Sequence, residues 1–151
     1  MPATKDVVEF WRRARREVAG LPQSPPEAWA FGATPQHADE LLGLVLVGIK
    51  TGTASSLWDY DADNEPLPVS GELSVILDGR GRPRAVIETS DVRTVPFDEV
   101  TEEHAHAEGE GDRTLAHWRT VHERFWREHS PCGFAPDMPV VCERFHLVWN
   151  D

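Results

Sequence analysis

Lys50 and Thr53 are the side chains of this sequence whose types and spacing first suggest catalysis. They lie in the segment Gly48–Thr53, and small and hydroxyl-bearing residues follow it. Deacylation of an amide needs a nucleophile, a base and a group that stabilises the oxyanion. Thr53 offers a hydroxyl, and a partly desolvated Lys50 amine could accept its proton. The chain has 13 arginines and only two lysines, which makes Lys50 stand out further.

Glu108 is the candidate for the third role in such a site. Its carboxylate could orient the Lys50 ammonium or carry a proton to the leaving amine. Lys50 could instead stabilise the phosphorane of RNA cleavage, in which the ribose 2′-hydroxyl is the internal nucleophile. The sequence does not separate these two reactions.

The residues around this segment suggest how a substrate would be held. Gly52 and Ser55 are small, so their backbone N–H groups can approach an oxyanion. A nucleobase pocket also needs a stacking ring. Trp58 and Tyr60 follow closely in the sequence and are the candidates for stacking.

Each of the three candidate catalytic residues also has an ordinary structural interpretation. Lys50 follows a predicted helix and could complement its dipole. Thr53 could be the first residue of a strand. Glu108 belongs to an acid-rich stretch over 99–112, which is typical of a solvated surface.

No metal cofactor is expected, and a divalent ion enters only if the protein is a ribonuclease. His104 and His106 are two residues apart on a predicted helix, so they point to different faces and bind one ion poorly. Cys132 and Cys142 lack the spacing of a zinc site.

Hydrophobic periodicity and turn signals predict an α+β fold that would position these residues. A Pro-rich linker is expected over 21–28. Strands joined through a hairpin, with helices inserted between them, favour an antiparallel barrel or sheet. Helices are predicted over 4–19, 34–48, 98–107 and 112–129, strands over 53–59, 72–77, 83–96 and 140–149, and a polar turn over 59–65.

Three segments resemble the ASCH domain family. Gly48–Thr53 fits the start of its G-x-K-x-x-T-x-R signature, and 95–112 and 141–145 look like later parts of the family. The resemblance covers roughly 28–149, so residues 1–27 are interpreted as an added amphipathic helix with its linker and 28–151 as the ASCH domain. It implies a PUA-like β-barrel with flanking helices and an association with RNA.

The resemblance also bears on activity. Some members are hydrolases of N4-acetylcytidine and others are ribonucleases. In the amidohydrolases a Lys, a Thr and a Glu act together, and they match Lys50, Thr53 and Glu108. The signature ends in an Arg where this chain has Ser55, so a polar substrate group would be held differently here.

Composition limits the partners. The formal net charge is −11, yet residues 1–20 carry five basic and three acidic side chains. An acidic body disfavours long duplex DNA, so a nucleic-acid contact should be a local pocket for single-stranded RNA or a modified nucleoside. No membrane segment or export signal is visible, which indicates a cytoplasmic protein.

The leading hypothesis is an RNA- or nucleoside-directed hydrolase. The alternatives are a non-catalytic RNA- or nucleotide-binding regulatory module and a protein that docks a partner through residues 4–19; the oligomeric state is not indicated.

Overall fold

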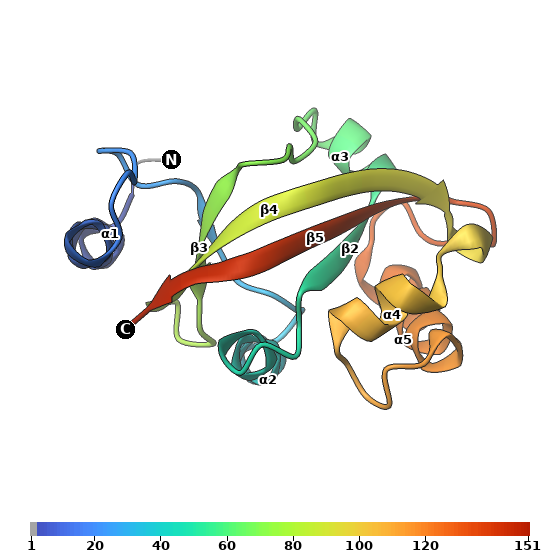
Figure 1. The fold of residues 1–151 in the computed structure, drawn as a ribbon. Helices are drawn as coiled ribbons and strands as arrows, with labels where there is room; N and C mark the ends of the chain where they lie inside the picture. The colour runs from blue at the N-terminus through green and yellow to red at the C-terminus, as the bar shows by residue number, and fades with distance from the viewer. Residues whose placement is uncertain (1–2) are drawn as a thin grey trace.

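The computed structural model describes residues 3–151 as a single sheet flanked by helices (Figure 1). A 3₁₀ turn over Phe97–Glu99 adds to the regular elements. The strands are β1 (Ala28–Trp29), β2 (Gly52–Ser56), β3 (Leu73–Leu77), β4 (Pro83–Pro96) and β5 (Pro139–Asn150). The α-helices are α1 (Lys5–Glu17), α2 (Pro35–Leu46), α3 (Leu57–Ala62), α4 (Glu102–Glu108) and α5 (Leu115–His129).

The sheet has the strand order β1-β3-β4-β5-β2. β1 runs parallel to β3, and the other neighbouring strands are antiparallel. β4 and β5 pair along nearly their whole length and form the long central ribbon of Figure 1. β1 and β2 are the two edges, so within residues 3–151 the sheet is open, which corrects the closed barrel that the resemblance implied. The α+β class itself is confirmed.

Helices α1 and α2 pack on opposite faces of this sheet. Phe10 and Trp11 of α1 form a buried cluster with Val75 of β3. Leu42 of α2 packs in a separate cluster with Ile76, the next residue of the same strand. Successive strand residues point to opposite faces, so the two helices cover the two sides of β3.

Helices α4 and α5 cover the other end of the sheet. Trp118 and Trp126 of α5 pack in one core cluster with Ala105 of α4 and with Val140 and Cys142 of β5. Figure 1 shows this helical layer at the opposite end of the sheet from α1. The predicted long helices are therefore confirmed as core elements.

Three local predictions are wrong in detail. The strand predicted over 53–59 ends at Ser56, and α3 takes the place of the strand end and of the first part of the polar turn. Asp59 lies in the first turn of α3, where a carboxylate is favourable, and it accepts a hydrogen bond from the Ser130 hydroxyl at 2.7 Å. The predicted helix 98–107 is divided at Thr101, whose side chain caps α4.

The short strand β1 begins at the last residue of the predicted linker over 21–28, and no sequence pattern predicts it. Ala28 and Trp29 pair with Val75 and Ile76 of β3. None of the helices in the described part of the chain is long and apolar enough to cross a membrane.

Candidate functional site

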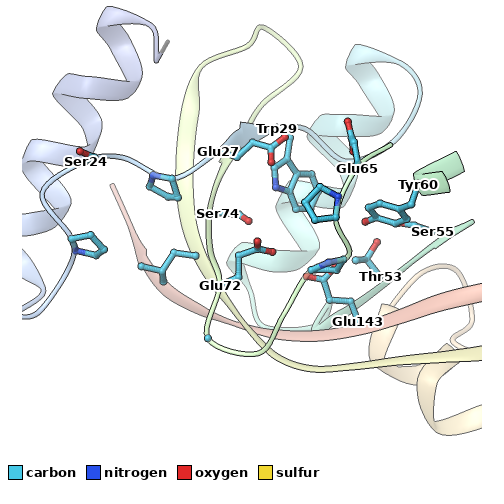
Figure 2. Close-up of a pocket in the computed structure, with 16 residues that line it drawn as sticks. Ser24, Glu27, Trp29, Thr53, Ser55, Tyr60, Glu65, Glu72, Ser74 and Glu143 are labelled. Carbon is cyan, nitrogen blue, oxygen red and sulfur yellow. The ribbon is translucent and has the colours of Figure 1, made fainter. Parts of the chain in front are cut away.

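A cavity of about 750 Å³ lies between β2, β3, the β1 segment and α3 (Figure 2). Its wall combines aromatic rings, hydroxyls and carboxylates. The polar and aromatic side chains that Figure 2 labels on this wall are Ser24, Glu27, Trp29, Thr53, Ser55, Tyr60, Glu65, Glu72, Ser74 and Glu143.

The register of β2 and β5 places a hydroxyl and a carboxylate together on this wall. Thr53 is directly opposite Glu143 in the antiparallel pair. Directly opposed residues share one face of a sheet, with Cβ atoms about 4.5–5.5 Å apart. The next residues, Ala54 and Cys142, face the core beneath α4 and α5.

Glu143 is held in a buried setting. Its Oε1 accepts a hydrogen bond of 2.6 Å from the Thr89 hydroxyl. Burial raises the pKa of Glu143, and the nearby charge of Glu72 adds to the shift, while the hydrogen bond from Thr89 opposes it. Partial desolvation likewise raises the pKa of Glu72, with a further contribution from Glu27.

Tyr60 and Trp29 supply the aromatic part of the wall. Burial raises the pKa of Tyr60; the hydrogen bond with Ser55 works in the other direction, and the charges of Glu143, Glu65 and Glu72 add to the rise. The phenol therefore stays protonated and can donate a hydrogen bond.

A smaller cavity of about 330 Å³ adjoins the first. The two share Trp29, Thr53, Ser55, Tyr60 and Glu65 on their walls. Ser56 also lines the smaller cavity and is 1% exposed. Its hydroxyl is the one buried side-chain polar atom within residues 3–151 that has no hydrogen-bond partner. Such a group is able to bind a ligand that reaches it.

Lys50 lies outside these cavities, in a buried ionic cluster. Its side chain is 1% exposed, and its Nζ is 3.0 Å from Glu110 Oε2 and 3.7 Å from Glu108 Oε1. The same Nζ donates to the Glu108 carbonyl at 3.3 Å and lies 5.3 Å from the centre of the Phe31 ring. Two carboxylates and a carbonyl therefore surround the Lys50 side-chain nitrogen.

Glu108 is the centre of this cluster. His104 Nε2 is 2.8 Å from its Oε2, His122 Nε2 is 3.3 Å from its Oε1, and the Trp118 indole N–H donates to Oε2. Burial opposes the charged form, but the charge of His122, the hydrogen bonds from both histidines and the charge of Lys50 outweigh it. They hold the pKa of Glu108 well below its usual range.

The two histidines differ in the partners of their second ring nitrogen. Both ring nitrogens of His122 face oxygens, because Nδ1 is 2.8 Å from the Trp118 carbonyl and Nε2 faces Glu108. That geometry fits an imidazolium: burial lowers the pKa of His122, but the Glu108 carboxylate raises it above the usual value. His104 Nδ1 accepts a hydrogen bond from Arg144 Nε at 3.3 Å, so Nε2 carries its proton.

Three side chains of this cluster are close enough to share a metal ion. One ligand atom each from Glu108, Glu110 and His122 lies within 4.8 Å of the others. The Lys50 ammonium already pairs with the two carboxylates of that group at 3.0 and 3.7 Å, and the His122 ring also contacts Glu108. The donor set therefore fits an ion-pair network better than a metal centre.

The structure thus brings together Lys50 and Glu108 but places Thr53 on the wall of the cavity, where neither of the other two lies. Of the predicted substrate-binding residues, Ser55 and Tyr60 line the cavity, Gly52 is buried beside Glu143 and Ala107, and Trp58 packs against the α5 core. Trp29, Glu72 and Glu143 were not foreseen. No local pattern marks them, because in β5 Glu143 shares its strand face with the apolar Val141.

Comparison with known proteins agrees with this architecture. The family model described as ASCH domain matches residues 27–149. The chain belongs to the ASCH domain family. None of the curated proteins matches this chain.

Two solved structures resemble this ASCH protein over almost its full length. Protein EF3133 from Enterococcus faecalis V583 has 38% sequence identity and a TM-score of 0.87, covering 95% of this chain and 88% of its own. An ASCH domain from Lactobacillus crispatus JV V101 has 28% identity and a TM-score of 0.87, covering 95% and 94%. The hypothetical protein PH0355, at 16% identity and a TM-score of 0.54, shares the fold over 80% of this chain and 99% of its own.

Proposed function

We propose that this ASCH protein binds a nucleobase, from single-stranded RNA or a modified nucleoside, in the cavity lined by Trp29 and Tyr60. ASCH domains are generally RNA-binding. The observation that carries the proposal is the composition of the wall: two aromatic side chains for stacking beside hydroxyls and carboxylates for the base edge.

The negative charge of the wall limits the chemical class of ligand that can enter the cavity. Glu27, Glu65, Glu72 and Glu143 line the cavity, and within residues 3–151 no Lys or Arg does. Carboxylates accept hydrogen bonds from amino groups such as the cytosine N4 amine. A phosphate in the same space would meet like charge, so the base enters while any phosphate remains outside.

The same charge favours amide hydrolysis over RNA cleavage as the activity. A ribonuclease must bind the scissile phosphate, and an acidic wall opposes that. Amide hydrolysis needs a nucleophile and an acid–base group, and Thr53 and Glu143 face each other on the wall. N4-acetylcytidine, which keeps an N4 proton to donate, is the substrate that we propose.

Side-by-side turnover assays test this proposal. The wild-type protein is incubated with N4-acetylcytidine and with a short labelled single-stranded RNA, each with and without Mg²⁺, and the products are separated by chromatography. We expect release of cytidine and no RNA cleavage. Trp29→Ala should raise the KM for the nucleoside by about tenfold, because the stacking interaction with the base is lost.

The alternatives give different results. Binding of N4-acetylcytidine without turnover would favour the non-catalytic nucleotide-binding module. Cleavage of the RNA would support the ribonuclease. If the protein neither binds nor turns over either probe, the proposed function is wrong.

A further inference from the structure

We propose that the outward face of α1 binds the phosphate backbone of single-stranded RNA. This basic face consists of Lys5, Arg12, Arg15 and Arg16. The inference rests on the proposed function for the class of ligand, and it deepens that function. It supplies the phosphate contacts that the acidic wall of the cavity cannot make, from a helix outside the residues 27–149 that match the family.

The spacing of charges along α1 gathers its basic side chains on one side. Lys5, Arg12 and Arg16 are seven and four residues apart, so they share the stripe opposite the buried residues of the helix. Arg15 flanks this stripe, and all four side chains are exposed. Glu9 is the acidic neighbour of the stripe, and it pairs with Arg12 at 2.8 Å. The basic face therefore carries four positive side chains against one negative side chain.

The remaining charges of α1 lie on a second stripe. Asp6, Arg13 and Glu17 are also seven and four residues apart. Arg13 is paired there with Asp151 at 3.5 Å. On the basic face, by contrast, the three residues other than Arg12 form no ion pair within residues 3–151. Their charges are therefore available to a ligand.

The stability of the helix does not explain this distribution of charge. The helix dipole makes a cation favourable in the last turn of a helix and unfavourable in the first. Arg15 and Arg16 lie in the last turn, but Lys5 is the first residue of α1 and Arg12 is near its middle. The basic face as a whole fits a ligand whose negative charge extends along the helix.

The apolar face of α1 is already occupied. Phe10 is 0% exposed, Trp11 is 1% exposed, and both pack in one cluster with Val75 of β3. An amphipathic helix binds a membrane by inserting its apolar face, which α1 cannot offer while it is packed on the sheet. The same packing fixes the basic face toward the solvent, where it can meet a phosphate backbone.

The chain connects this basic face to the cavity. α1 ends at Glu17, and Pro22, Ser24 and Pro26 of the following segment line the cavity. The Trp11 indole N–H donates to the Pro22 carbonyl at 2.8 Å and so fixes the start of that segment to α1. Figure 2 shows the segment leading from α1 past Ser24 to the cavity. A strand with one base in the cavity would therefore have a side of the rim that leads directly to α1.

The charge of the rest of the chain favours a single strand over a duplex. Residues 21–151 carry ten basic and 23 acidic side chains. The basic face extends over roughly 16 Å of helix, which is long enough for more than one phosphate of an extended strand. A duplex would bring the phosphates of its second strand toward the acidic body, where like charges repel.

Fluorescence anisotropy with a labelled single-stranded RNA of about ten nucleotides tests the assignment. The variant Arg12→Gln/Arg15→Gln/Arg16→Gln removes three charges and keeps good helix formers, so α1 should stay folded. We expect its Kd at low salt to rise by at least about tenfold. The slope of log Kd against log salt should fall by about 2, because each phosphate contact of a single strand contributes about 0.7.

Two measurements control for the loss of charge. The variant Arg119→Gln/Arg124→Gln/Arg127→Gln has the same net charge, but its three exposed arginines lie on α5, at the other end of the sheet (Figure 1). It should bind the RNA as tightly as the wild type. Calorimetry with N4-acetylcytidine, which has no phosphate, should give the same Kd for the wild type and both variants.

The outcomes separate this surface from the proposed function. A wild type that binds no RNA, or an equal loss of affinity in the two variants, would overturn the inference. Vesicles with phosphatidylserine that bind the wild type but not the α1 variant, while the RNA affinities of the two are equal, would show a membrane surface and overturn it too. A wild type that binds RNA through α1 but does not bind N4-acetylcytidine would support this inference and overturn the proposed nucleobase site.

Discussion

Lys50 shows how a residue chosen for its chemistry can serve the structure. Its ammonium is 3.0 Å from Glu110 and 3.7 Å from Glu108, two residues at the C-terminal end of α4 and just beyond it. Next to this ion pair, the backbone N–H of Thr51 donates a hydrogen bond to the Ala107 carbonyl at 2.7 Å. The two contacts together connect the start of β2 to α4. A buried ion pair of this kind is costly to break from one side, because the remaining charge stays in the interior.

Lys50→Met should therefore destabilise the protein by about 3–5 kcal/mol. Chemical denaturation compared with wild type measures the change. Lys5→Met, at an exposed position of α1, is the control and should change the free energy of unfolding by less than about 0.5 kcal/mol. Equal stability of Lys50→Met and wild type would contradict the structural role.

His122 predicts how stability depends on pH. Its pKa is raised in the folded chain because its ring faces the Glu108 carboxylate. The stabilisation is complete below the unfolded pKa of about 6.5 and is lost as the pH rises through the higher folded value.

The melting temperature of the wild type should therefore fall more steeply than that of His122→Gln as the pH rises above about 6.5. Glu108, His104 and Lys50 are present in both proteins, so the difference reports His122. Parallel profiles measured by differential scanning fluorimetry would show that His122 does not bind its proton more tightly in the folded state.

At the scale of elements, α1 is an integral part of the core. Trp11 is 1% exposed, packs near Val75 and Val86, and donates from its indole N–H to the Pro22 carbonyl at 2.8 Å. That contact also fixes the start of the segment that leads to β1 and to the wall of the cavity.

Trp11→Ala should cost about 3–5 kcal/mol, which lowers the melting temperature by roughly 2–4 °C for each kcal/mol in a chain of this size. Val8→Ala, on the outer side of the same helix, should change the melting temperature little. Thermal unfolding of both variants compares a packed with an exposed position. A Trp11→Ala protein as stable as Val8→Ala would indicate that α1 does not support the sheet.

The long elements were predictable from sequence, whereas the short ones were not. The apolar stripes of α1, α2 and α5 and the alternation of β3 to β5 repeat over several turns or residue pairs. β1 has two residues, and its pairing partner Val75 lies more than 40 positions away, so no local pattern marks it. α3 is six residues long and depends on the hydrogen bond between Asp59 and Ser130.

At the scale of the whole molecule, the cavity is assembled from distant parts of the chain. Trp29 comes from β1, Thr53 from β2, Glu72 from the approach to β3 and Glu143 from β5. Local motifs therefore led to Thr53, Ser55 and Tyr60, which are near one another in sequence. Trp29, Glu72 and Glu143 required the register of the sheet.

The charge of the whole chain adds to that of the cavity. With a net charge of −11 and four carboxylates on the wall, cytidine should bind more tightly than cytidine 5′-monophosphate. The difference should narrow as salt is added, since screening weakens the repulsion. Calorimetric titrations at low and high salt measure both affinities; tighter binding of the monophosphate would show that a cationic surface contributes to the site.

The most direct test of the central claim is a ¹H–¹⁵N NMR titration of the wild-type protein with N4-acetylcytidine. Our account predicts that the largest shifts occur at the backbone amides of Thr53, Ser55, Tyr60 and Glu143 and at the Trp29 indole N–H. Shifts confined to α1 or to the surroundings of Lys50 and Glu108, or no shifts at saturating nucleoside, would contradict it.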